Sequence, residues 1–194
     1  MNWTLLFNPF KKLPSKSLLL LGLVAFIAFS LYSWMNQIIY DGMLDIHLDD
    51  QLNPLDYFNA NAINIIIVVL LFHAFALIVN SKTRLVDIFA TSVIYRIPIY
   101  IASLFVKSDA MLSVASKLEN LNGSLENLKF STSELVTMMG ISFLSLILMI
   151  WSIVLLFFGF KTASNAKLWW HNALFILAVI LGETITKILI NTIL

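Results

Sequence analysis

The side chains most able to do chemistry in this sequence are charges inside long apolar stretches. Arg96 interrupts the apolar run 88–106, and Glu183 and Lys187 interrupt the run 168–194. A charge at membrane depth is costly, so it marks a functional hypothesis with a partner to be named. Arg96 lies about 11 residues and Glu183 about 14 residues into these runs, so at 1.5 Å per residue their depths differ by roughly 5 Å. We therefore predict that the two side chains face each other inside a helix bundle.

Lys187 lies one helical turn beyond Glu183 and is placed to bind the same carboxylate as an i,i+4 partner. The structural interpretation of the three residues is a neutral clasp that fixes helix packing. The functional interpretation is a relay for protons or ions, or a substrate contact. In a third interpretation, Lys187 only extends its amine to the outer interface.

Other polar residues lie in the same kind of apolar run. His73 is able to titrate near neutral pH, but a lone histidine here is expected to hydrogen-bond a neighbouring helix. Asn61 and Asn64 are expected to be interhelical hydrogen-bond donors. Pro98 has no backbone N–H to donate, so it is expected to kink the run that contains Arg96.

An enzyme or a metal site finds little support. Five aspartates and His47 lie between residues 41 and 59, which suits a divalent cation, but their order does not match a calcium-binding loop; the simpler interpretation is an outer loop without positive charge. Cysteine is absent, and the three histidines fall on different segments. No phosphate-binding loop, dinucleotide motif or zinc-protease motif is present. We expect no catalytic residue, metal or cofactor.

These residues must be positioned by membrane-spanning helices. The chain is 60% hydrophobic and 12% charged, with a mean hydropathy of +0.91, whereas a soluble domain is about 45–50% apolar and about 25% charged. A chain of this size cannot bury that many apolar residues in its own core. The remaining apolar surface must therefore face lipid. We predict one all-α domain over residues 1–194, with five spans at about 17–40, 60–80, 86–106, 135–160 and 168–192.

Lysine and arginine predict the orientation, because cytoplasmic loops are enriched in them. Every second connection is basic, with the residues Lys11, Lys12, Lys16, Lys82, Arg84, Lys161 and Lys167. The N-terminus is therefore predicted in the cytoplasm and the C-terminus outside. A cleaved signal peptide is the alternative, but the first apolar run continues past Ser30 through Trp34, which is too long for one.

The third connection is predicted to hold a short amphipathic helix on the outer membrane surface. Apolar residues fall there at helical spacing: Met111, Val114, Ala115, Leu118 and Leu121. Ser131 and Glu134 have the spacing of a capping box that opens the fourth span. Residues 122–124 form a glycosylation sequon, meaningful only in a eukaryotic lumen.

The order of these features resembles the Yip (Ypt/Rab-interacting protein) family, in particular its short prokaryotic members. The stretch 7–12 reads FNPFKK before the first span, Pro98 follows Tyr95 in the third span, and the fourth span ends in 151–161, WSIVLLFFGFK. The resemblance implies five spans and an inner-membrane location. The chain lacks the long N-terminal region and the Asp-Leu-Tyr-Gly-Pro element of eukaryotic members, so a role in Rab binding is not carried over.

Two functions are compatible with this sequence. The first is a membrane scaffold or organiser whose partners are the lipid bilayer and other membrane proteins or further copies of itself. The second is a small transporter or channel subunit that uses the intramembrane charges. A net charge of +1 disfavours nucleic acid as a partner. A polar cavity that reaches Arg96, Glu183 or His73 would favour transport.

Overall fold

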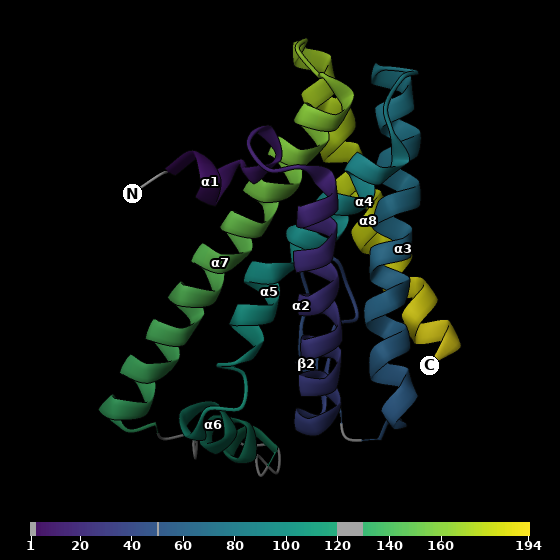
Figure 1. The fold of residues 1–194 in the computed structure, drawn as a ribbon. Helices are drawn as coiled ribbons and strands as arrows, with labels where there is room; N and C mark the ends of the chain where they lie inside the picture. The colour runs from purple at the N-terminus through teal and green to yellow at the C-terminus, as the bar shows by residue number, and fades with distance from the viewer. Residues whose placement is uncertain (1–2, 50, 120–129) are drawn as a thin grey trace.

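The computed structural model describes residues 3–49, 51–119 and 130–194 (Figure 1). It is a helical bundle with five apolar helices long enough to cross a membrane, so the predicted all-α, multi-pass class is confirmed. The spanning helices are α2 (Ser15–Asn36), α3 (Pro54–Val79), α4 with α5 (Leu85–Ile94 and Arg96–Ser103), α7 (Thr132–Ser164) and α8 (Trp169–Ile193). The shorter elements are α1 (Trp3–Phe7), η1 (Pro9–Lys11), β1 (Ile38–Ile39), β2 (His47–Leu48) and α6 (Asp109–Glu119).

Two predicted boundaries are corrected by local capping. The first span ends at Asn36 rather than near residue 40, because Gln37 adopts a left-handed conformation with φ of 54°. The second span begins at Pro54 rather than near residue 60, since the Asp56 carboxylate accepts a bond from the Asn53 N–H at 3.0 Å. An acceptor placed there satisfies one of the free N–H groups of a helix start.

The fourth span opens with the predicted capping box. The N–H of Glu134 donates to Ser131 Oγ at 3.2 Å, and the N–H of Ser131 donates to the Glu134 carboxylate at 2.8 Å. Lys117 of α6 also donates to that carboxylate at 2.7 Å, which ties α6 to α7. Figure 1 shows α6 lying across the end of the bundle, as an interfacial helix does. The sequon and Leu121 lie outside the described residues.

The third span is divided at Tyr95 into α4 and α5. Pro98 has no N–H to donate to the Ile94 carbonyl one turn earlier, and this missing bond interrupts the helix. Next to this position, Ser152 Oγ of α7 donates a hydrogen bond to the Tyr95 carbonyl at 2.7 Å. The bond connects the break in the third span to α7.

Only the third span lies at the centre of the bundle. In the most apolar stretch of this span 67% of the residues are buried, whereas 22–28% are buried in the same kind of stretch of the other four spans. It contacts α2, α3 and α7, while α8 packs chiefly along α3. The fifth span, which carries Glu183, therefore lies outside this centre.

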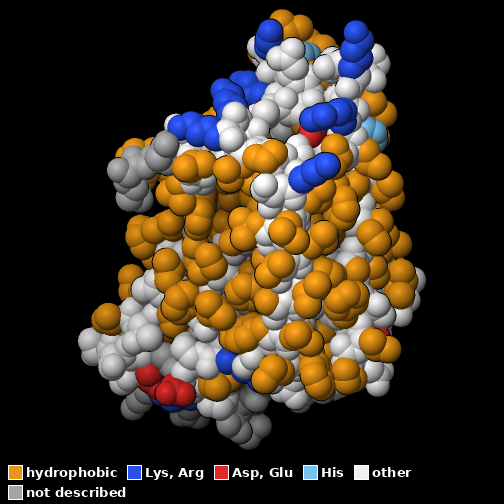
Figure 2. Space-filling view, viewed as in Figure 1, with side chains coloured by type: hydrophobic (Ala, Val, Ile, Leu, Met, Phe, Trp, Pro, Cys, Tyr) orange, Lys and Arg blue, Asp and Glu red, His pale blue; other side chains and the backbone are white. Residues whose placement is uncertain are grey.

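Charge divides the two ends of the bundle. Figure 2 shows an apolar band with lysine and arginine gathered beyond one edge of it. We call this the basic end; it carries Lys11, Lys12, Lys16, Lys82, Arg84, Lys161 and Lys167. The opposite end, which holds α6 and the connection between α2 and α3, is called the loop end.

Candidate functional site: a re-entrant loop held by buried charges

The connection 37–49 turns back into the bundle and is called the re-entrant loop here. Its residues 38–43 are all buried, with Ile38, Tyr40 and Met43 at 0% exposure. Strands β1 and β2 pair antiparallel, with Ile39 opposite His47, and close the loop into a hairpin. Irregular backbone is tolerated at membrane depth only where protein surrounds it. The segment has no lysine or arginine, as the interpretation of an outer loop requires, but that interpretation did not include the burial of residues 38–43.

Arg96 anchors the tip of the loop. It is completely buried, seven residues before the end of α5, or about 10 Å from the loop end of that helix. One guanidinium nitrogen donates to the carbonyls of Gly42 and Met43 at 2.9 and 3.1 Å, and another donates to Asn61 Oδ1 at 3.2 Å. The cation thus satisfies carbonyl groups of a loop that lies outside any helix.

Two tyrosines enclose this cation. Their rings lie 5.2 Å (Tyr40) and 5.6 Å (Tyr100) from the guanidinium carbon, within the range of a cation–π interaction. The Tyr40 hydroxyl shares a 2.9 Å hydrogen bond with Ser103 Oγ, and Tyr100 donates to Asn61 Oδ1 at 2.9 Å.

Glu183 binds the same loop from α8. Its carboxylate accepts a hydrogen bond from the Leu44 N–H at 3.1 Å and lies 3.5 Å from Lys187 Nζ, the predicted i,i+4 contact. Lys187 in turn donates to Asp45 at 2.5 Å. That bond holds the pKa of Asp45 below its ordinary value of 3.8.

The predicted direct contact between Arg96 and Glu183 is replaced by contacts through the loop. Among the described residues no ion pair joins the two, and each binds peptide groups between Gly42 and Leu44 instead. The sequence suggested that Arg96 and Glu183 lie at similar depths along their helices. The sequence did not reveal that a loop occupies the space between them.

The two asparagines of α3 complete the site. Asn61 donates to Ser30 of α2 at 2.9 Å, as an interhelical donor does, and it also accepts from Arg96 and Tyr100. Asn64 donates to the Tyr40 carbonyl at 2.5 Å. The acceptor role of Asn61 is the part that sequence reasoning missed. The signal for it was an asparagine at the same depth as Arg96.

The remaining candidates lie apart from this site. Nδ1 of His73 is buried and makes no hydrogen bond to any described residue, so this atom does not make the expected interhelical contact. Asp41 lies 3.2 Å from His47, but the described residues contain no group of three or more metal-binding side chains. The structure has four cavities that described residues line and that do not include Arg96, Glu183 or His73.

In comparisons with known proteins, no family model, no curated protein and no solved structure matches this chain.

Proposed function

We propose that this protein is a non-enzymatic membrane scaffold that packs against other membrane proteins through the first half of α7. The observation that carries the proposal is an unburied stretch of helix. From Thr132 to Ile147 no residue of α7 is buried, over roughly 24 Å of helix. Figure 1 shows this half of α7 leaning away from the rest of the bundle.

The surface of this half-helix suits a second transmembrane helix. Large apolar side chains project from it, among them Met139 at 71% and Phe143 at 66% exposure. Gly140 has no atom within 4 Å of where a Cβ would lie, and Ser142 and Ser145 are also small. Small residues let helix backbones approach closely, which is what drives helix association in lipid.

The intramembrane charges support a structural role better than transport. Arg96 is occupied with two loop carbonyls and Asn61, and Glu183 with the Leu44 N–H and Lys187. A transport site needs charges that face a path open to water. The four cavities described above do not reach these residues, so we infer that they brace the re-entrant loop.

The family and location belong to the same proposal. We infer a Yip-like protein of the prokaryotic inner membrane, with its basic end in the cytoplasm. Two stretches that carry the resemblance meet: Trp151 Nε1 donates to the Leu6 carbonyl at 3.0 Å, just before the FNPFKK stretch. Asn8 and Pro9 of that stretch are buried, so it is part of the fold.

Site-specific photo-crosslinking in native membranes tests the scaffold proposal. A photoreactive amino acid at Met139 or Phe143 should give discrete adducts with one or a few membrane proteins, including further copies of this chain. The matched controls are Ile180 and Ile188 of α8, which are exposed to a similar degree at 57% and 60%. Equal adducts from all four positions, or none from α7, would overturn the proposal.

Transport is tested separately in proteoliposomes that contain a pH-sensitive dye for protons or a sodium-sensitive dye for sodium. We expect proton or sodium flux no greater than in protein-free vesicles. A flux that Glu183→Gln abolishes would identify a transporter and displace the scaffold proposal.

A further inference from the structure

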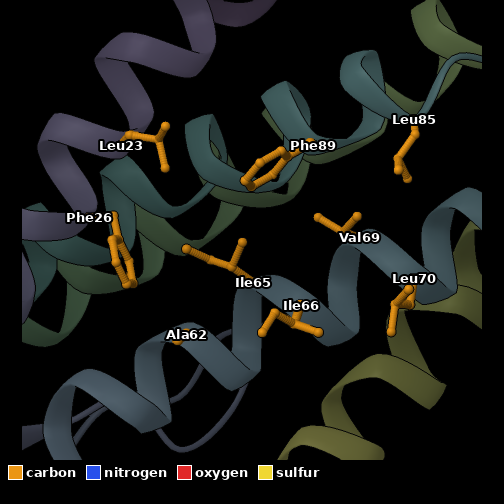
Figure 3. Close-up of a pocket in the computed structure, with 9 residues that line it drawn as sticks. All are labelled: Leu23, Phe26, Ala62, Ile65, Ile66, Val69, Leu70, Leu85 and Phe89. Atoms are coloured by element: carbon orange, nitrogen blue, oxygen red, sulfur yellow. The ribbon is translucent and has the colours of Figure 1, made fainter. Parts of the chain in front are cut away.

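A wholly apolar groove runs along the lipid-facing side of the bundle between α2, α3 and α4 (Figure 3). Its volume is about 360 Å³, within the usual range of about 300–1,000 Å³ for small-molecule sites. Nine residues line it: Leu23, Phe26, Ala62, Ile65, Ile66, Val69, Leu70, Leu85 and Phe89. A polar molecule would find no hydrogen-bond partner on these walls, whereas a hydrocarbon chain matches them.

The same face of α3 becomes polar just beyond the groove. His73 follows Val69 and Leu70 by four and three residues and Ile66 by seven, so it continues the groove face one turn toward the basic end. Its Nδ1 atom is buried and has no partner among the described residues. Protein atoms cover Nδ1 itself, but His73 is only partly buried, so the rest of its ring is accessible to a polar group from outside the chain.

Two lysines follow at the basic end. Lys16 precedes Leu23 by seven residues, which puts it on the same face of α2, about 10 Å nearer that end. Lys82 lies in the short connection just before Leu85, the groove residue closest to the basic end. Lys16 makes no ion pair with a described residue, and neither does Lys82. Arg84 beside them is already paired with Asp87 at 2.8 Å.

We propose that this groove binds one anionic phospholipid. An acyl chain fills the apolar part, the ester and glycerol oxygens lie opposite His73, and the phosphate group lies between Lys16 and Lys82. Basic residues at the membrane surface attract anionic head groups by about 1 kcal/mol each. Toward the basic end, the apolar groove is followed by His73 and then by the two lysines. A phospholipid has its parts in the same order, with the acyl chain followed by the ester groups and then by the phosphate. This binding site does not depend on the scaffold role.

Binding of defined lipids to the purified full chain tests the proposal. The chain in detergent is titrated with dioleoylphosphatidylglycerol or dioleoylphosphatidylcholine, and bound lipid is counted by native mass spectrometry. One phosphatidylglycerol should bind about tenfold more tightly than phosphatidylcholine, which has the same chains and no net charge. A phosphatidylglycerol-to-phosphatidylcholine ratio near one would overturn the proposal.

Two substitutions locate the site. The double variant Lys16→Gln/Lys82→Gln should lose most of the preference for phosphatidylglycerol. Its control is Lys11→Gln/Lys167→Gln, which removes the same charge from other elements of the basic end. If both variants lost the preference for phosphatidylglycerol equally, the lipid would be attracted to the basic end as a whole, and the proposed site would be refuted.

The groove itself is tested by filling it. Ile66 lines the groove and is 53% exposed, so Ile66→Trp should occupy the volume without disturbing the core and should weaken binding of both lipids. Its control is Ile78→Trp on the opposite face of α3, where the side chain is 63% exposed. Circular dichroism confirms that each variant folds. Unchanged phosphatidylglycerol binding by Ile66→Trp would place the chain elsewhere and refute the proposal.

Discussion

Arg96 and Glu183 hold neighbouring peptide groups of the same loop from two different helices. Arg96 donates to the carbonyls of Gly42 and Met43, and Glu183 accepts from the N–H of Leu44. The positive guanidinium therefore faces the negative ends of two peptide dipoles, and the negative carboxylate faces the positive end of one. The loop lies between the two charges and binds both, and the charges satisfy backbone groups that lipid could not.

Replacing Arg96 should destabilise the protein more than any exposed charge does. Arg96→Met keeps most of the volume but takes the donor away from the buried Gly42 and Met43 carbonyls, so we expect a loss of about 2–4 kcal/mol in the free energy of unfolding. The measurement is unfolding in mixed micelles of increasing dodecyl sulfate content, followed by circular dichroism. Arg96→Lys, which retains a donor, should fall between wild type and Arg96→Met.

The control for this prediction is Lys167→Met, which removes one positive charge from an exposed position outside the spans. It should change the free energy of unfolding by less than about 0.5 kcal/mol. Similar losses in Arg96→Met and Lys167→Met would mean that the buried bonds do not stabilise the loop.

Gly22 marks the closest approach of α2 to α4. A Cβ built on this residue would lie 2.2 Å from Val93 Cγ2 and 3.1 Å from the Val93 backbone carbon, so the two helices would have to separate. We expect Gly22→Ala to destabilise the protein by about 1–3 kcal/mol through overpacking. The same micelle titration measures it.

Gly140→Ala is the matched control for this contact, because Gly140 lies in a helix and a Cβ there meets no atom within 4 Å. Alanine favours a helix over glycine by about 1 kcal/mol, so this variant should be neutral or stabilised. If Gly22→Ala behaved like Gly140→Ala, the tight contact between α2 and α4 would be disproved.

The five spans could be predicted because long apolar runs and flanking charges set them. The re-entrant loop could not, since Ile38, Ile39 and Tyr40 continue the apolar run of the first span and only the left-handed Gln37 ends the helix. What stabilises the loop is long-range: Arg96 lies 54 residues after Gly42. A hydropathy pattern contains no information about such contacts, so it assigned the apolar residues to the helix.

The contact between Asp45 and Lys187 should be insensitive to pH until strongly acidic conditions. A carboxylate whose folded pKa is lowered contributes stability above its ordinary value, here 3.8, and loses it as pH falls through the lower folded pKa. The contribution of this contact to the free energy of unfolding should therefore stay constant from about pH 8 to 5. Both side chains are about 40% exposed or more, so the contribution is below about 1 kcal/mol.

The measurement for this contact is the difference in free energy of unfolding between wild type and Asp45→Asn at a series of pH values. The difference should be constant at neutral pH and shrink toward zero below the ordinary pKa of the aspartate. His47 lies in the same loop, 3.2 Å from Asp41, so His47→Gln in both backgrounds serves as the control. A difference that changes between about pH 5 and 8 would contradict the assignment.

The orientation of the bundle is open to a direct labelling experiment, because the chain contains no cysteine. Single cysteines are introduced at Lys82 at the basic end and at Asn191 near the end of α8. The positive-inside rule places Lys82 in the cytoplasm and Asn191 outside. In intact cells a membrane-impermeant maleimide should label Asn191→Cys and leave Lys82→Cys unlabelled, and disrupting the membrane should expose both. The reverse pattern would invert the topology and move the proposed lipid site to the outer leaflet.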